Sequence, residues 1–172
     1  ILDFDFRQDV FDGWWDVSFN AVEDPALCYS PTWCNLREAY QLEGDGSPWF
    51  CSLGKLRNGT TANGNADLSP SGSCVSGIPV DATYHHIRVT KMGTSIRVEI
   101  PDLAVDRAYQ DCHPLLGGGF RFGAGGYHKH TYVDNLRWER LNIDRSTWDA
   151  DLDGEADFCD TCQDTDHDGF GN

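Results

Sequence analysis

Short segments in which apolar and polar residues alternate recur along the chain, and this period of two is the feature that most restricts its fold. The clearest are Leu2–Phe6, His85–Lys91, Ser95–Ile100, Gly119–Gly123 and Thr131–Trp138. Alternation places every second side chain on one face of a strand, whereas a helix repeats every 3.6 residues. Helical periodicity is scarce, and 18 glycines punctuate the chain. The pattern therefore predicts an all-β protein, a β-sandwich or jelly roll.

The C-terminal segment Asp149–Asn172 carries nine of the 28 acidic residues of the chain and neither Lys nor Arg. Two D-x-D-x-D-G stretches begin there, at Asp149 and Asp164. Carboxylates at alternate positions can converge on one Ca²⁺ if the chain then turns sharply, which Gly154 permits. A run of charge is more often a solvated tail, but a solvated tail requires neither fixed offsets nor a recurring glycine.

These offsets assign ligands to two calcium loops. In the first loop the predicted ligands are the side chains of Asp149, Asp151, Asp153, Asp157 and Asp160 and the backbone carbonyl of Glu155. In the second, incomplete loop they are the side chains of Asp164, Asp166, Asp168 and Asn172 and the carbonyl of Phe170. We therefore expect at least one bound Ca²⁺ as the cofactor of this chain.

The spacing of acids and cysteines also resembles a known family. Asp149–Cys162 matches the D-x-D-x-D-G-x-x-D-x-C-D-x-C unit of thrombospondin type-3 repeats, and the following residues match the start of the next unit. An EF-hand or dockerin loop would instead be followed by an amphipathic helix, which Phe158–Gln163 does not provide. The resemblance implies an extracellular, irregular calcium-binding segment over residues 146–172, held in shape by Ca²⁺ and disulfides.

Seven cysteines beside calcium loops favour an oxidising compartment. Zinc is the competing interpretation of the Cys159-x-x-Cys162 pair, but no second C-x-x-C completes a zinc site. In type-3 repeats cysteines pair with the neighbouring repeat, which implies an upstream partner for Cys159. We expect the disulfides Cys28–Cys34, Cys51–Cys74 and Cys112–Cys159, with Cys162 left free, although spacing alone does not fix the connectivity.

The order of features before Arg145 resembles the concanavalin A-like (laminin G-like) jelly-roll superfamily. A Phe4-x-Phe6 strand is followed by Trp14-Trp15, a Tyr-x-x-Ile-x-Val hairpin, a Gly-x-x-Phe-Gly-Ala segment and a terminal Tyr132–Trp138 strand. The resemblance implies a concanavalin A-like β-sandwich over residues 1–145. Lectins, carbohydrate-binding modules, adhesion domains and some glycosidases belong to this superfamily.

The sequence does not predict an enzyme. The glycosidases of that superfamily carry a Glu-x-Asp-x-x-Glu strand, and this run is absent, as are the G-x-S-x-G, H-E-x-x-H and P-loop motifs. Histidines offer a transition-metal alternative, although singly exposed histidines are the commoner case. Adjacent strand residues point to opposite faces, so only one of His85 and His86 could join His113, His128 and His130.

Aromatic residues make up 12% of the chain and include six tryptophans, more than an alternating core needs. Flat rings held on loops suit the faces of sugars. The predicted glycan-binding residues are Trp33, Trp49 and Tyr127, with polar contacts from Asn35, Asp45 and His128. We therefore expect a non-catalytic, lectin-like carbohydrate-binding module. The alternative is a structural or cell-adhesion spacer, rigidified by calcium, in which these rings are core residues.

Charge and hydropathy limit the partners. Before Asp149 the chain is only mildly acidic, which disfavours nucleic acid and anionic membranes as partners. No apolar run approaches the roughly 20 residues that span a bilayer. The expected partners are a glycan or a cell-surface or matrix ligand, together with neighbouring domains of a larger secreted protein.

A further calcium could lie between the first and last strands, at Asp3, Asp5 and Asp134, although solvent-facing strand carboxylates need no ion.

Overall fold

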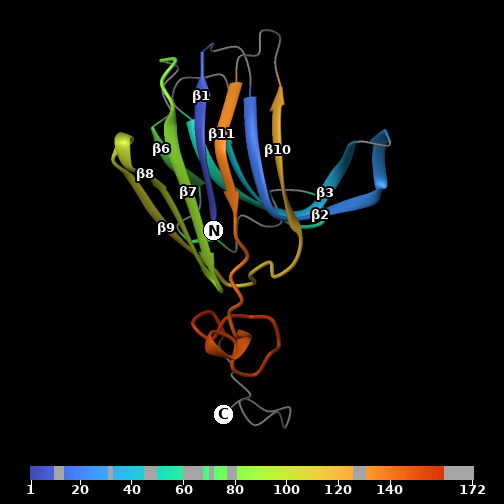
Figure 1. Cartoon of the computed structure of the whole chain (residues 1–172). Helices are drawn as coiled ribbons and strands as arrows, with labels where there is room; N and C mark the ends of the chain where they lie inside the picture. The colour runs from blue at the N-terminus through green and yellow to red at the C-terminus, as the bar shows by residue number, and fades with distance from the viewer. Residues whose placement is uncertain are drawn as a thin grey trace.

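Two antiparallel sheets that pack face to face form the body of the molecule in the computed structural model (Figure 1). The structure describes residues 1–9, 14–30, 33–44, 50–59, 68–69, 72–76, 81–125 and 131–160. The first sheet contains, in order, β11 (Thr131–Trp138), β1 (Leu2–Gln8), β7 (His85–Met92), β8 (Ser95–Ile100), β9 (Val105–Asp111) and β5 (Leu68–Ser69). The second contains β10 (Gly119–Gly125), β2 (Trp14–Ser30), β3 (Trp33–Gly44), β4 (Phe50–Leu56) and β6 (Gly72–Ser76).

This architecture confirms the predicted all-β fold, and each alternating segment of the sequence lies in a strand. The predicted hairpin is formed by β7 and β8, which turn at Gly93–Thr94. Within the described residues, helical structure is limited to two short 3₁₀ turns, η2 (Pro101–Leu103) and η3 (Arg145–Thr147). None of the helices described is long and apolar enough to cross a membrane.

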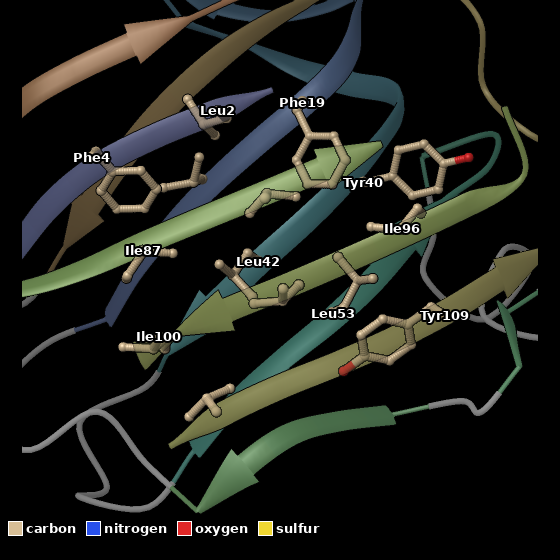
Figure 2. Packing of buried hydrophobic residues seen from close by; sticks show 14 of the residues in the cluster. Leu2, Phe4, Phe19, Tyr40, Leu42, Leu53, Ile87, Ile96, Ile100 and Tyr109 are labelled. Atoms are coloured by element: carbon tan, nitrogen blue, oxygen red, sulfur yellow. The ribbon is translucent and has the colours of Figure 1, made fainter. Parts of the chain in front are cut away.

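The space between the sheets is filled by side chains from both of them (Figure 2). Phe4 and Phe6 of β1 are fully buried, as the alternation predicts. The Phe6 ring lies against Trp15 of β2, with ring centroids 4.6 Å apart. Further buried side chains from five strands complete this core: Phe19, Tyr40, Leu42, Ile87, Val89, Ile96, Val98, Ile100 and Tyr109. Burial of apolar area on this scale is the main source of stability in a sandwich.

A charged network is buried within the same sandwich. The Lys55 ammonium of β4 lies 2.8 Å from an Asp111 oxygen and donates to the His113 carbonyl at 2.6 Å. The other Asp111 oxygen accepts from the Tyr40 hydroxyl, which itself accepts the Leu115 amide at 2.9 Å. Both charged side chains are fully buried. Because an opposite charge and further hydrogen bonds compensate each ion, the network is compatible with its buried position.

Beyond β11 the chain leaves the sandwich and forms a compact loop at one end of it (Figure 1). The described part of this loop, residues 139–160, contains η3 and no strand. A disulfide between Cys112 and Cys159 joins it to the end of β9, as the sequence predicted. The Ala156 amide donates to the Cys112 carbonyl at 2.8 Å beside this bond. The loop is therefore anchored covalently and by a backbone hydrogen bond.

Candidate metal centre and adjoining pocket

The C-terminal loop brings the first three predicted calcium ligands together. Asp149, Asp151 and Asp153 each offer one carboxylate oxygen, and these oxygens all lie within 4.8 Å of one another. The loop closes because Leu152 and Gly154 adopt positive φ angles of 64° and 105°. Glycine reaches this conformation without the steric cost that a side chain imposes, in agreement with the turn predicted after the third acid. The three aspartates form a group that could hold a metal ion.

Asp149 is the buried member of the group, and its two oxygens differ. Its Oδ2 atom accepts hydrogen bonds from Arg145 Nε at 2.5 Å and from the Gly154 amide at 3.1 Å. Its Oδ1 atom is buried and has no hydrogen-bond partner in the part of the chain that the structure describes. An ionised oxygen removed from water without a partner costs several kcal/mol. A cation at the cluster would supply the missing partner.

The remaining predicted ligands of this loop lie nearby but outside the group of three. Asp157 Oδ1 accepts the Ala150 amide at 2.8 Å and so closes the loop on itself. Asp160 and Glu155 are half-buried. The second predicted loop, with Asp164, Asp166, Asp168, Phe170 and Asn172, lies outside the described residues, as does Cys162.

A pocket of about 240 Å³ lies where the C-terminal loop meets the sandwich. Apolar side chains of the sandwich core line part of its wall, among them Phe19, Val89 and Leu115. Trp138 at the end of β11 and Trp148 beside the aspartates also line it, together with Lys91. The sequence analysis did not identify this pocket. One signal was available: Lys91 follows Ile87 and Val89 at the inward positions of a strand, where a charged residue is rarely found.

Trp148 packs closely against the turn between β7 and β8. A Cβ atom at Gly93 would lie 2.7 Å from Trp148 Cδ1, so the indole occupies the space that any other residue there would need. The Trp148 carbonyl also accepts the Asp157 amide at 3.0 Å. One residue therefore contacts the sandwich through its ring and the acidic loop through its backbone.

Burial lowers the pKa of the Lys91 ammonium to about 8, even though Asp111 lies near enough to favour its charged form. Its amine donates to the Gly93 carbonyl at 2.8 Å and lies 5.5 Å from the centre of the Tyr40 ring. Among the described residues, no carboxylate lies within ion-pair distance of it. The pocket therefore holds a partly desolvated cation that has no neutralising partner of its own.

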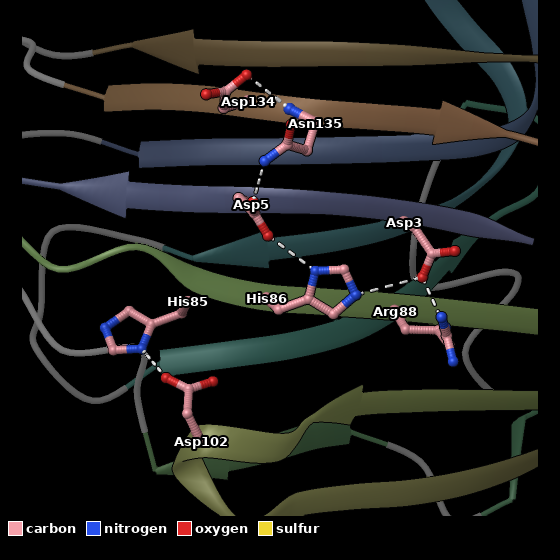
Figure 3. Close-up of polar contacts among 8 residues, drawn as sticks. All are labelled: Asp3, Asp5, His85, His86, Arg88, Asp102, Asp134 and Asn135. Atoms are coloured by element: carbon pink, nitrogen blue, oxygen red, sulfur yellow. Dashed lines mark hydrogen bonds and ion pairs between the residues drawn. The ribbon is translucent and has the colours of Figure 1, made fainter.

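The outer face of the first sheet carries the acids for which a further calcium was considered (Figure 3). Asp3 accepts from Arg88 Nε at 2.6 Å, and Asp5 lies 2.8 Å from His86 Nδ1. Hydrogen bonds from Asn135 and then His86 lower the pKa of Asp5. The carboxylates of Asp3 and Asp5, which that calcium would need as ligands, thus already have side-chain partners in this chain. Asp3 is also buried, contrary to the expectation of a solvent-facing carboxylate, because Arg88 covers it.

The two adjacent histidines of β7 point to opposite faces, as alternation predicts. His85 is 3% exposed, with Nδ1 lying 2.5 Å from Asp102, whereas His86 is 44% exposed. The carbonyl of His113 belongs to the Lys55 network. His128 and His130, the other members of the transition-metal alternative, lie outside the described residues.

The predicted glycan-binding residues fall where the structure gives no side-chain description. Trp33 and Asn35 belong to β3, but their side chains are not among those described. Asp45, Trp49, Tyr127 and His128 lie outside the described residues altogether. The disulfides Cys28–Cys34 and Cys51–Cys74 also fall on side chains outside that description. All of these assignments stay predictions.

Comparisons with known proteins do not assign this chain to a family. No protein-family model matches the chain, and no curated protein matches it. Among solved structures, the chain is similar to the carbohydrate-binding module CBM66 from Bacillus subtilis, with 14% sequence identity, 78% of this chain and 71% of that chain covered, and a TM-score of 0.46. Similarity at this level supports no conclusion about a ligand, so function is inferred from the residues of this chain.

Proposed function

We propose that this chain is a non-catalytic extracellular module whose C-terminal segment binds Ca²⁺ and whose β-sandwich binds carbohydrate. The observation that carries the calcium assignment is a buried Asp149 oxygen that has no hydrogen-bond partner among the described residues and belongs to a group of three carboxylates. Carboxylate oxygens are hard ligands that suit Ca²⁺ and Mg²⁺ rather than softer transition metals. Flexible loop geometry favours Ca²⁺, which accepts six to eight oxygens, over the strict octahedron of Mg²⁺.

The proposal extends the site beyond the three aspartates. Asp157, Asp160 and the Glu155 carbonyl complete the first calcium shell, with residues 146–172 as the calcium segment and residues 1–145 as the sandwich. A second loop begins at Asp164. The disulfide between Cys112 and Cys159 supports the extracellular setting, because such bonds persist mainly in oxidising compartments.

Isothermal titration calorimetry with CaCl₂ tests the calcium assignment. The wild type is compared with the double variant Asp151→Asn, Asp153→Asn, which keeps the size of both side chains and removes their charge. Asp106→Asn, on the exposed edge of the sandwich, is the control for the loss of a surface carboxylate. We expect calcium uptake in the wild type and the control, and its loss or severe weakening in the double variant. Equal uptake by all three proteins would contradict the assignment.

The proposal of carbohydrate binding is supported by exposed aromatic rings that lie beside polar groups. Trp138 and Phe120 are partly exposed at the edge of the sandwich, with ring centroids 5.6 Å apart, and Trp138 lines the pocket. Exposed rings beside polar side chains are the usual means of binding a sugar. The loop residues Trp33, Trp49 and Tyr127, with Asn35, Asp45 and His128, are proposed as a further contact surface.

A structural or cell-adhesion spacer is the competing function, favoured by the covalent anchoring of the loop to the sandwich through the disulfide between Cys112 and Cys159. A glycan array probed in CaCl₂ and in EDTA separates the two functions. Reproducible binding to any glycan supports the carbohydrate-binding module. A complete absence of binding by a folded, calcium-loaded protein would replace it with the spacer.

A further inference from the structure

The pocket between the sandwich and the C-terminal loop concentrates positive charge in an acidic protein. The whole chain carries a formal net charge of −15. Among the described residues, the basic side chains that line the pocket are Lys91, Arg140 and Arg145, and the one acidic residue is Glu139. Arg145 is engaged by Asp149, so its charge is largely offset. Among the described residues, neither Lys91 nor Arg140 has a carboxylate partner, and Lys91 is the more buried of the two because Arg140 is exposed.

The position of Lys91 makes it a group that favours an anion. The amine has three hydrogen-bond donors, and the Gly93 carbonyl accepts from it at 2.8 Å. The nearest buried acid, Asp111, already accepts from Lys55, Tyr40 and the His113 amide. A desolvated ammonium gains most from a charged acceptor, because a hydrogen bond between ions is stronger in a partly buried site than in water.

The other walls favour a sugar over a bare carboxylate. Two tryptophans, Trp138 and Trp148, line the pocket, and Asn20 and Asn142 add amide groups suited to hydroxyls. The volume of about 240 Å³ is below the roughly 300–1,000 Å³ of pockets for larger ligands. A single monosaccharide unit therefore fits the pocket better than a long oligosaccharide.

We propose that this pocket binds one uronic acid unit of a glycan, with the sugar carboxylate at the Lys91 ammonium and the ring against the tryptophans. This inference rests on the carbohydrate-binding function proposed above and names its ligand class and site. Binding of the uronic acid should depend on calcium, because Trp148 in the pocket wall is followed directly by Asp149 of the metal centre.

The affinity of a panel of methyl uronides tests this assignment. Methyl glucuronide, galacturonide and mannuronide are each compared with the neutral methyl glycoside of the same sugar, and acetate represents the bare carboxylate. We expect at least one uronide to bind about tenfold or more tightly than its neutral partner, as loss of a hydrogen bond to a charged group predicts. Acetate should bind more weakly than that uronide, and addition of EDTA should lower the affinity of the protein for the uronide.

Two variants locate the effect. Lys91→Met removes the ammonium at nearly constant volume, whereas Arg97→Gln removes a cation from the exposed outer face, away from the pocket. We expect Lys91→Met to abolish the preference for the uronide and Arg97→Gln to retain it. In the wild type, the indole N–H signals of Trp138 and Trp148 should shift on addition of the uronide, a readout that does not depend on the folding of any variant.

Several results would overturn the inference. It is wrong if no uronide binds better than its neutral glycoside, if acetate binds as tightly as the uronide, or if Lys91→Met keeps the preference. It is also wrong if neither indole signal shifts, or if EDTA leaves uronide affinity unchanged. If one of these tests fails while the same protein binds neutral sugars on a glycan array, the carbohydrate-binding function stands and only this site is rejected. An array without any binding would reject both.

Discussion

The sandwich and the C-terminal loop reach an ordered structure by different physical means. In the sandwich, side chains such as Phe4 and Ile96 are removed completely from water, and even the buried Lys55 and Asp111 neutralise each other. In the described part of the loop, Ala156 is the one fully buried apolar residue, while Leu152 and Phe158 are exposed. Its order depends instead on carboxylate contacts, backbone turns and one disulfide. The first region is stabilised by exclusion of water, and the second requires compensation of its negative charge.

The largest effect is expected from the core. Phe4→Ala should destabilise the sandwich by about 3–5 kcal/mol, through lost burial and a cavity, and Ca²⁺ should not restore the loss. Chemical denaturation in CaCl₂ and in EDTA measures this. Phe158→Ala is the matched control. Because the Phe158 ring is 56% exposed, its removal should change the free energy of unfolding by less than about 0.5 kcal/mol. Equal losses in the two variants would contradict the distinction between the regions.

The buried ion pair should behave as part of the core. Lys55→Met leaves the Asp111 carboxylate buried without its cation and should cost about 3–5 kcal/mol. Adding Asp111→Asn to this variant should recover part of the loss, because the uncompensated charge is then removed. A double-mutant cycle of unfolding free energies measures the coupling. Additive losses would show that the two groups do not stabilise each other.

Removal of the disulfide should affect the loop more than the sandwich. Cys112→Ala with Cys159→Ala opens a link across 47 residues, for which chain entropy predicts a cost of about 2–4 kcal/mol. Because the bond anchors the loop that we propose to bind Ca²⁺, the affinity for Ca²⁺ should fall in the same variant. Calorimetry and denaturation together measure both effects. Unchanged calcium affinity would mean that the loop is ordered independently of its anchor.

The smallest effect is a pH dependence at the junction. Burial lowers the Lys91 pKa from 10.5 to about 8, so the unfolded chain binds more protons than the folded chain between these pH values. Stability should therefore rise with pH across this window, by up to about 3 kcal/mol for a difference of this size. Lys91→Met should lack the rise, while Arg97→Gln should retain it. The same rise in all three proteins would mean that Lys91 is not the group responsible.

The sequence predicted the strands better than it predicted the site. Alternation located β1, β7, β8, β10 and β11, because one face of each strand meets the core and the other does not. The glycine and acid offsets likewise located the three clustered aspartates, since a ligand loop is a local structure. The disulfide between Cys112 and Cys159 was reached through a family resemblance, not through spacing.

Features that depend on contacts between distant segments were not predicted. The Lys55–Asp111 pair joins strands of different sheets, and the pocket is formed by residues from both ends of the chain. The burial of Asp3 follows from Arg88 on the neighbouring strand, which the pattern of one strand cannot reveal.

Amide hydrogen exchange measured by mass spectrometry in CaCl₂ and in EDTA tests the central distinction most directly. Chelation should remove protection from amides of residues 149–160, such as the Gly154 amide that donates to Asp149, because the negative charges there lose their cation. Amides of β1, β7 and β8 should keep their protection under both conditions. Protection of residues 149–160 that is equal in CaCl₂ and EDTA would contradict the account, as would a sandwich that loses protection together with them.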